Sequence, residues 1–415
     1  MKKKLLLINP ANSKYKGGLA STKRTYMPLG LSVIAALTPD SWAVEILDEN
    51  IDAFEFKEAD LVGITAFTST CSRAYEIAAI YKKNGIKTVI GGIHASMNPD
   101  EAIKYFDMVV IGEAESVWSK LIEDFEKGEN QKVYTAQIMD LKGLPKPRRD
   151  LLKNSYSYAA IQTSRGCPMN CEFCSVSIFN GTSYRLRPIE EVLDELETIP
   201  QKRLFFVDDN LIGSSREHQE RAINLFKGMI ERGINKKWLC QSSMNVADNE
   251  EVLKYASMSG CMAILIGIEA EKIDSLKTIN KNINLKKIGN YEEAFKRINK
   301  HKISILGTFI YGMDTDSIED LINRTNFIIN SSVNIVQATV LTPLPGTRLF
   351  KKLEETQRLR YINYPEDWGE YSFVNAVYNP VLMSTDELSE SFKKALFKIY
   401  SVSVKLTSNF DHFSR

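Results

Sequence analysis

The feature that most constrains the fold is a series of short apolar runs that alternate with stretches of helical periodicity. In the first 140 residues these runs predict strands at Lys4–Asn9, Val44–Leu47, Leu61–Ala66, Thr88–Ile90 and Met108–Ile111. Strands that are apolar throughout and separated by helices are typical of a parallel sheet with helices on both faces. Residues 1–140 are therefore expected to form a doubly wound, Rossmann-like α/β domain.

A second alternating series follows a short linker. The segment Leu144–Asp150 places two prolines among charged residues, which predicts a linker over residues 141–155. The strands expected beyond it are Tyr158–Thr163, Leu204–Val207, Trp238–Gln241, Ala263–Ile268, Ser304–Ile310 and Ile335–Leu341. Six such units are fewer than the eight that close a barrel, so residues 156–345 are expected to form a partial (β/α)6 TIM barrel.

The pattern changes after Pro345, and residues 346–415 are expected to form a small, mostly helical C-terminal cap. Leu388, Phe392 and Ile399 would share one apolar helical face in this tail. The preceding stretch Tyr361–Tyr378 is rich in aromatic residues but has little periodicity. Its rings could wall an apolar pocket.

Charge and hydropathy exclude several functional classes. Lys and Arg total 53 and Asp and Glu total 52, so there is no electrostatic footprint for a nucleic acid. No apolar stretch reaches the roughly 18 residues of a transmembrane helix. The apolar run after the first lysines is shorter than the roughly 7–15 residues of a signal peptide core. Cys71, Cys240 and Cys261 are scattered rather than arranged as a disulfide framework, which indicates a reducing cytoplasm.

Three further cysteines, Cys167, Cys171 and Cys174, have the spacing Cys-x3-Cys-x2-Cys. Three thiolates can hold three irons of a 4Fe–4S cluster and leave the fourth open, whereas electron-transfer clusters usually have four protein ligands. A zinc knuckle would need a fourth Cys or His nearby, and the chain offers none. A redox pair of Cys171 and Cys174 would leave Cys167 unexplained, and three unconnected structural thiols remain a further alternative. The triad follows the first barrel strand, where barrel active sites lie, so an open cluster is favoured.

This motif, preceded by Arg165-Gly166, resembles the signature of the radical S-adenosylmethionine superfamily. The resemblance implies that the open iron chelates the amino and carboxylate groups of S-adenosylmethionine. One electron, from a donor such as flavodoxin or ferredoxin, would then release a 5′-deoxyadenosyl radical that abstracts hydrogen from an unactivated C–H bond. In such an enzyme the cofactors carry the hard chemistry and the protein positions and shields them.

The same resemblance implies which side chains contact S-adenosylmethionine. These are Phe173, Ser243, Asn245, Glu269, Gly307 and Thr342. Phe173 would pack at the adenine, Glu269 would bind the ribose hydroxyls, and Gly307 would let the adenine approach. Ser243 and Asn245 would bind the carboxylate. Asp208 and Asp209 occupy the place of a Gly-Gly-Glu segment that contacts the substrate amine in many relatives, but capping of the next helix explains them equally well.

The N-terminal region resembles the cobalamin-binding domain fused ahead of many radical S-adenosylmethionine enzymes, through Met27–Leu31, Gly91–Ala95 and Gly112–Glu115. The resemblance implies cobalamin at the carboxyl ends of the strands, contacted by Thr65, Phe67, Gly91, Gly92, His94, Gly112 and Glu113. The loop of residues 9–15 lacks the cobalt-ligating His of many cobalamin domains, as is common in the fused family. His94 is expected to be a polar loop contact rather than a cobalt ligand. An α/β scaffold without a ligand is the alternative.

Together these features predict a cytoplasmic, cobalamin-dependent radical enzyme that methylates an unactivated carbon through methylcobalamin. Leu204–Asn210 and Gln241–Asp248 look like the branch that contains hopanoid C-2 methylases, which favours a small or lipid-like substrate. Carbon–carbon bond formation, rearrangement or oxidation on the same scaffold is the first alternative. A tRNA methylthiotransferase would need more N-terminal cysteines than Cys71, and a cobalamin or iron–sulfur sensor is the non-enzymatic alternative.

Overall fold

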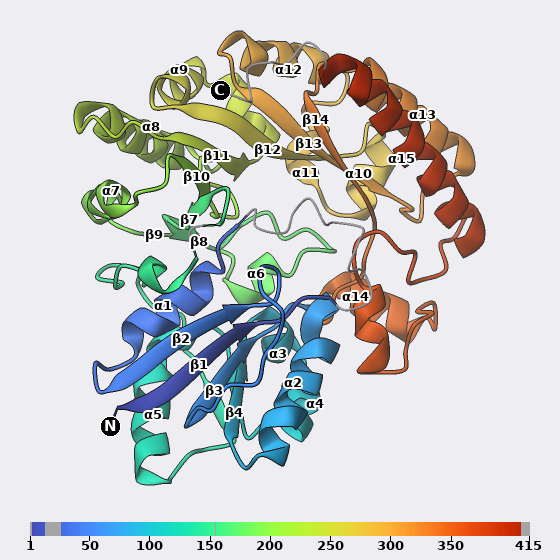
Figure 1. Cartoon of the computed structure of the whole chain (residues 1–415). Helices are drawn as coiled ribbons and strands as arrows, with labels where there is room; N and C mark the ends of the chain where they lie inside the picture. The colour runs from blue at the N-terminus through green and yellow to red at the C-terminus, as the bar shows by residue number, and fades with distance from the viewer. Residues whose placement is uncertain (1, 13–25, 154, 408–415) are drawn as a thin grey trace.

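The N-terminal sheet contains six parallel strands in the order β2-β1-β3-β4-β5-β6 (Figure 1). We describe it, and the rest of the chain, from a computed structural model that covers residues 2–12, 26–153 and 155–407. The strands are β1 (Lys3–Asn9), β2 (Trp42–Asp48), β3 (Leu61–Thr65), β4 (Lys87–Gly91), β5 (Met108–Ile111) and β6 (Val133–Thr135). The order reverses between β1 and β3, which makes a switch point where ligands of such sheets bind.

Helices cover both faces of this sheet because its strands are apolar on both sides. One face packs against α1 (Leu29–Leu37) and α5 (Trp118–Lys127). The other packs against α2 (Cys71–Lys83), α3 (Ile93–Met97) and α4 (Pro99–Tyr105). The predicted Rossmann-like fold is thus confirmed.

The second sheet also has six parallel strands, in the order β14-β13-β12-β11-β10-β7. They are β7 (Ala159–Ile161), β10 (Arg203–Phe206), β11 (Lys237–Ser242), β12 (Cys261–Glu269), β13 (Ser304–Tyr311) and β14 (Ile335–Val340). Its outer face is covered by α7 (Ile189–Thr198), α8 (Arg216–Glu231), α9 (Glu250–Met258), α12 (Tyr291–Lys300) and α13 (Ile318–Asn330). Strands β7 and β14 are the two edges, so the barrel is partial, as predicted.

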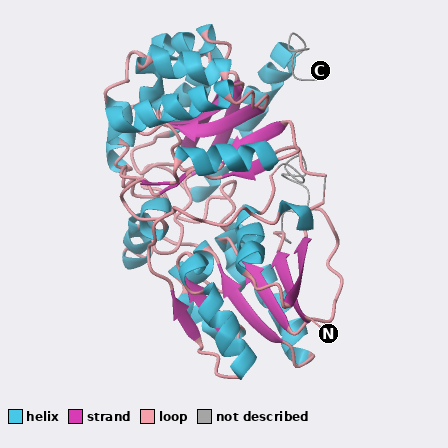
Figure 2. Ribbon diagram, turned by 90° about the vertical axis from the view of Figure 1, so that its left-hand side faces the viewer, coloured by secondary structure: helices cyan, strands magenta, loops and turns pink. Residues whose placement is uncertain are grey.

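Short elements connect the two sheets and carry the loops between them (Figure 2). They are the hairpin of β8 (Ser164–Arg165) and β9 (Arg185–Leu186), the helices α6 (Val176–Phe179), α10 (Ile273–Thr278) and α11 (Asn282–Leu285), and the 3-10 turns η1 (Thr68–Thr70), η2 (Ala114–Ser116), η3 (Arg149–Leu151) and η4 (Met244–Asp248). Among the described residues, no helix is both long enough and apolar enough to cross a bilayer.

The C-terminal segment is helical at both ends but does not stand apart from the two sheets. It contains α14 (Arg348–Glu355), η5 (Glu366–Glu370) and α15 (Thr385–Thr407). Helix α15 packs against α13 and buries Phe392 and Ile399 in the core of the partial barrel. Trp368 and Tyr371 instead join the core of the N-terminal sheet, beside α2. The predicted cap is therefore shared between both parts of the molecule.

Candidate functional site

The three clustered cysteines lie on one long loop between the two strands of the β8–β9 hairpin. Gly166 begins the loop with φ +92°, and a Cβ there would collide with the carbonyl oxygen of Ser183, so glycine is required. The N–H of Cys167 donates to the carbonyl of Gly181 (3.1 Å), which closes the loop near its base. All three cysteines therefore lie on one closed loop that follows β7 along the chain.

The thiols form a donor set that fits an iron–sulfur cluster. None is in a disulfide, and Cys171 is buried while Cys167 and Cys174 are partly so. Burial raises the pKa of all three thiols, that of Cys174 to about 12, and the ammonium of Lys281 opposes this shift in each case. Sulfur donors of this kind, shielded from water and beside a cation, suit a polynuclear iron site.

The cysteine loop is anchored from two distant parts of the chain. Arg348 donates through Nη1 to the side chain of Asn170 (2.6 Å) and through Nε to Glu172 (2.9 Å). The N–H of Glu172 donates to the carbonyl of Ile279 (3.1 Å), and Asn280 Nδ2 donates to the carbonyl of Asn170 (2.8 Å). These contacts tie the cysteine loop to α14 and to the segment between α10 and α11.

Glu269, at the end of β12, is displayed by a strained backbone. Its φ is +64°, and a register shift interrupts the pairing with β13 between Gly267 and Glu269. One carboxylate oxygen pairs with Lys281 Nζ (3.1 Å) and the other accepts from Thr308 Oγ1 (3.2 Å). Non-glycine residues in this region of φ are uncommon and cluster at ligand sites. The sequence indicated Glu269 but not Lys281, which lies among ordinary polar residues and has no motif of its own.

The remaining residues expected at S-adenosylmethionine lie in different settings. Phe173 packs on the small core around Ala270. Ser243 is buried, and its hydroxyl accepts from Asn210 Nδ2 (3.0 Å). Asn245 Nδ2 donates to the carbonyl of Gly213 (2.9 Å), which leaves its Oδ1 buried and without a partner in the described part of the chain. An orphaned acceptor suits an N–H or O–H donor, so Asn245 fits an ammonium group rather than the carboxylate expected of it.

Gly307 and Thr342 both lie in closely packed surroundings. A Cβ at Gly307 would meet Ile268 (2.8 Å) and Val333 (3.0 Å) on the helix side of the sheet. The glycine is needed for packing there, and its neighbour Thr308 faces Glu269 instead. Thr342 is buried and donates to the carbonyl of Val340 (3.0 Å).

Asp208 has neither of the roles considered from the sequence. Its fully buried carboxylate accepts from Thr163 N–H (3.1 Å) and Ser164 Oγ (2.5 Å), so it fixes the start of the hairpin that carries the cysteines. Ser215, not Asp208 or Asp209, caps the next helix. Burial raises the pKa of Asp209 to about 6.

The loops after β3, β4 and β5 form the edge where cobalamin is expected. Thr65, Gly91 and Gly112 are partly exposed at the strand ends. Phe67 follows β3 at the switch point and is 65% exposed. Gly92 adopts φ +93°, and a Cβ there would lie 2.7 Å from Thr65 Oγ1. An exposed ring beside close-packed glycine turns fits a broad, flat corrinoid. Residues 13–15 of the first loop lie outside the described part of the chain.

His94 is not a polar contact for a ligand, contrary to the prediction. It is fully buried, with Nδ1 3.4 Å from Thr68 Oγ1 and Nε2 3.3 Å from Glu101 Oε1. Trp368 Nε1 donates to the same carboxylate (3.0 Å). Cys71 lies in the same cluster, within 4.8 Å. Because His94 and Glu101 are already partnered, the cluster ties the C-terminal segment to the N-terminal sheet.

Glu113 likewise differs from the prediction, because both of its oxygens are bound by arginines. Arg165 Nη1 (2.8 Å) and Arg185 Nη1 (2.9 Å) contact one oxygen, and Arg185 Nη2 contacts the other. Arg165 Nη2 also pairs with Glu115 (2.5 Å). Burial alone would raise the pKa of Glu113, but Arg185 and Arg165 outweigh it and lower that pKa. We call these four residues the inter-sheet latch; it joins the loop after β5 to the base of the cysteine loop.

The latch sets the carboxyl ends of the two sheets facing each other. Glu113 and Glu115 follow β5, and Arg165 directly precedes Gly166 and Cys167. The Gly112–Glu115 motif and the cysteine motif were each recognisable in the sequence, but no local pattern indicated that the two contact each other.

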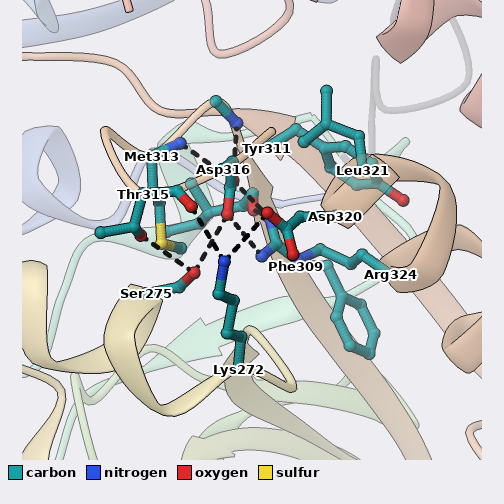
Figure 3. A network of polar contacts seen from close by, with 12 residues as sticks. Lys272, Ser275, Phe309, Tyr311, Met313, Thr315, Asp316, Asp320, Leu321 and Arg324 are labelled. Atoms are coloured by element: carbon teal, nitrogen blue, oxygen red, sulfur yellow. Dashed lines mark hydrogen bonds and ion pairs between the residues drawn. The ribbon is translucent and has the colours of Figure 1, made fainter. Parts of the chain in front are cut away.

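A buried ion pair fixes the end of β13 behind this site (Figure 3). Arg324 is fully buried and donates to both oxygens of Asp316 (2.7 and 2.9 Å) and to the carbonyl of Ile310 (2.6 Å). Asp316 also accepts from Met313 N–H (3.0 Å) and Ser275 Oγ (3.0 Å). The loop between β13 and α13 is thereby locked to α10.

Comparison with known proteins gives independent information. Residues 15–122 match the B12 binding domain family, and residues 161–328 match the radical SAM superfamily. Bacteriochlorophyllide d C-12(1)-methyltransferase of Chlorobaculum tepidum is 31% identical, over 96% of this chain and 88% of its own length. Hopanoid C-2 methylase of Rhodopseudomonas palustris is 28% identical, over 91% of this chain and 73% of its own length. The predicted kinship is confirmed.

A solved structure shares the fold over nearly the whole chain. The cobalamin-dependent S-adenosylmethionine radical enzyme OxsB, with aqua-cobalamin and S-adenosylmethionine bound, superposes with a TM-score of 0.76 at 16% identity. The match covers 95% of this chain and 66% of OxsB. At this identity the likeness concerns the arrangement of the two sheets.

Proposed function

The chain belongs to the radical S-adenosylmethionine enzymes that carry an N-terminal cobalamin-binding domain, and on this premise we propose that it methylates an unactivated carbon atom. Its two matched domains bring a 4Fe–4S cluster, S-adenosylmethionine and cobalamin as cofactors. Both relatives named above are methyl-transferring enzymes, and the family is that of class B cobalamin-dependent methyltransferases. The observation that supports the proposal is the inter-sheet latch, which joins the loop after β5 to the base of the cysteine loop.

Cys167, Cys171 and Cys174 would hold the cluster, with Asn245 and Glu269 at the S-adenosylmethionine. Phe67 and the strand-end positions Thr65, Gly91 and Gly112 would contact the corrinoid. When bound, the cluster supplies the electron that cleaves S-adenosylmethionine, and the corrinoid supplies the methyl group.

The residues of this chain orient and shield that chemistry. The orphaned Oδ1 of Asn245 would accept from the amino group of S-adenosylmethionine, and the carboxylate of Glu269 would accept from its ribose hydroxyls. Arg348 and Asn280 hold the cysteine loop in place through hydrogen bonds to Asn170. Such prior positioning lowers the entropic cost of bringing reacting groups together.

The substrate we propose is a small or lipid-like apolar molecule, bound between the two sheets. Phe67 offers an exposed ring at this edge. Both relatives act on large, mostly apolar ring systems by their names, a bacteriochlorophyllide and a hopanoid. A flavodoxin or ferredoxin would supply the electron, in the cytoplasm, where the free cysteines stay reduced.

The test begins with anaerobic reconstitution using iron and sulfide in protein produced with cobalamin. Separate cluster and corrinoid absorbance bands are expected. Cys171→Ala should lose the cluster band, whereas Cys240→Ala, which changes a buried thiol of the barrel core, should keep it. Retained cluster absorbance in Cys171→Ala would contradict the assignment of the ligands.

The reaction is tested with S-adenosylmethionine carrying a trideuterated methyl group, a chemical reductant and extracts of apolar metabolites. The expected result is 5′-deoxyadenosine together with a product heavier by one trideuterated methyl in place of hydrogen. A product with any other mass gain would favour a different radical reaction. No 5′-deoxyadenosine from cluster-loaded protein would refute radical chemistry altogether.

A further inference from the structure

Lys281 is a buried cation beside the cysteine loop that none of the roles described so far uses. It lies in the connection between α10 and α11, and its side chain is only 13% exposed. A buried ammonium is costly unless it is paired, and its one ion-pair partner in the described chain is Glu269 at 3.1 Å. The side chain of Glu269 is only 7% exposed, so both charges of the pair are largely removed from water.

The position of Lys281 is fixed by its neighbours on both sides. Ile279 and Asn280, which precede it, are hydrogen-bonded to Glu172 and Asn170 of the cysteine loop. Asn284, which follows it, is buried and donates to the carbonyls of Gly267 (2.7 Å) and Ile268 (2.9 Å) at the end of β12. Lys281 is therefore held between the cysteine loop and the strand that carries Glu269.

Space for the Lys281–Glu269 pair comes from the missing side chain of Gly267. A Cβ at this position would lie 2.7 Å from Lys281 Nζ and would collide with Glu269 Oε1. The backbone of Gly267 has an ordinary φ, so its conformation alone does not call for glycine. The glycine at position 267 thus leaves room for the Lys281–Glu269 pair, and the fold then buries this pair.

The ammonium is the buried positive charge held beside the cysteine loop, because the two residues that precede Lys281 are hydrogen-bonded to that loop. Glu269 places a negative charge at the same point, 3.1 Å from Lys281 Nζ. Reduction of a cluster held by the three cysteines would add one negative charge on this loop. A nearby buried cation stabilises the more negative, reduced form, and a nearby carboxylate disfavours it.

We propose that Lys281 is a positioning residue that raises the reduction potential of the cluster held by the three cysteines, and that Glu269 works in the opposite direction. The proposal rests on the proposed function, because it requires the cluster. It concerns the one-electron step that precedes cleavage of S-adenosylmethionine, in which an external reductant donates the electron.

The test is a mediated redox titration of anaerobically reconstituted protein without S-adenosylmethionine, with iron content measured for each variant. Lys281→Met should lower the midpoint potential, so that a smaller fraction of cluster is reduced at a fixed potential. Lys281→Arg, which keeps the charge, should stay close to the wild type. Glu269→Gln should move the midpoint in the opposite direction, to a higher potential.

Lys286→Met is the matched control, since Lys286 is exposed five residues further on and should leave the potential unchanged. A potential equal to the wild type in Lys281→Met with full iron content would overturn the proposal, as would shifts of the same sign in Lys281→Met and Glu269→Gln. If Lys281→Met fails to fold or to load iron, Glu269→Gln decides the sign. A wild-type protein that binds no iron would instead refute the cluster assignment.

Discussion

Replacing Arg324 by Met tests how strongly the buried ion pair of Figure 3 stabilises the partial barrel. The change leaves the carboxylate of Asp316 inside the protein with only backbone N–H groups and Ser275 Oγ as partners. It also removes the donors to Ile310 and Glu271. Breaking a buried pair by removing one partner costs about 3–5 kcal/mol. This is a large part of the roughly 5–15 kcal/mol by which proteins are stable.

The assay is urea unfolding of the apo protein, followed by circular dichroism. We expect a lower midpoint for Arg324→Met because the uncompensated charge of Asp316 is relieved on unfolding. The double variant Asp316→Asn/Arg324→Met removes both charges, so it should be more stable than Arg324→Met alone.

Arg216→Met is the control for this experiment. Arg216 pairs with Glu220 on the same helix, but its side chain is 93% exposed. Exposed pairs of this kind contribute about 0.2–1 kcal/mol. If Arg324→Met unfolds at the same urea concentration as Arg216→Met, the reasoning about the buried pair is wrong.

Three further perturbations follow from other contacts. Trp368→Ala should lower the free energy of unfolding by about 3–5 kcal/mol in a thermal unfolding experiment, because it leaves a cavity in the core between the N-terminal sheet and α2. Glu113→Ala should make residues 141–155 more sensitive to limited proteolysis, because Arg185 loses its carboxylate partner and Arg165 keeps only Glu115. Burial would raise the pKa of Asp320, but hydrogen bonds from Ser317 and the ion pair with Lys272 hold it at about 2. Because that pKa is depressed, the stabilisation is present above about pH 4 and is lost as pH falls toward 2. Asp320→Asn should therefore reduce the loss of stability between about pH 4 and pH 2.

Each of these perturbations has a control or a refuting outcome. Phe397→Ala removes an exposed ring and should leave the melting temperature nearly unchanged. Glu197→Gln changes an exposed carboxylate on α7 and should not alter the proteolysis rate. Equal cleavage rates in the wild type and Glu113→Ala would show that the latch does not hold the sheets together. If Asp320→Asn loses stability at acid pH as the wild type does, the assignment of that pKa is wrong.

Periodicity predicted both sheets because most of their strands lie in apolar runs that carry a pattern. It missed β6, which has three residues, and the β8–β9 hairpin, whose strands have two each. Such elements are defined by their partners and not by their own sequence. The family, the cofactors and the class of enzyme were predicted correctly, because the cysteine spacing is local and specific.

The site was less predictable because its contacts are distant in sequence. A polar residue after a glycine turn looks the same whether it points outward to a ligand or inward to the protein. His94 and Glu113 were assigned to cobalamin on that basis, and both point inward. Arg185 lies 72 residues from Glu113, and Lys281 lies more than 100 residues from Cys171. No local pattern encodes either pairing.

The place of Trp368 and Tyr371 has a consequence for synthesis on the ribosome. These rings complete the core beneath β1 and β3, although they are made roughly two hundred residues after β6. At translation rates of about 5–20 residues per second, the interval is on the order of tens of seconds. One side of the apolar core of the first sheet to be made is therefore completed only by a segment that is translated long after β6.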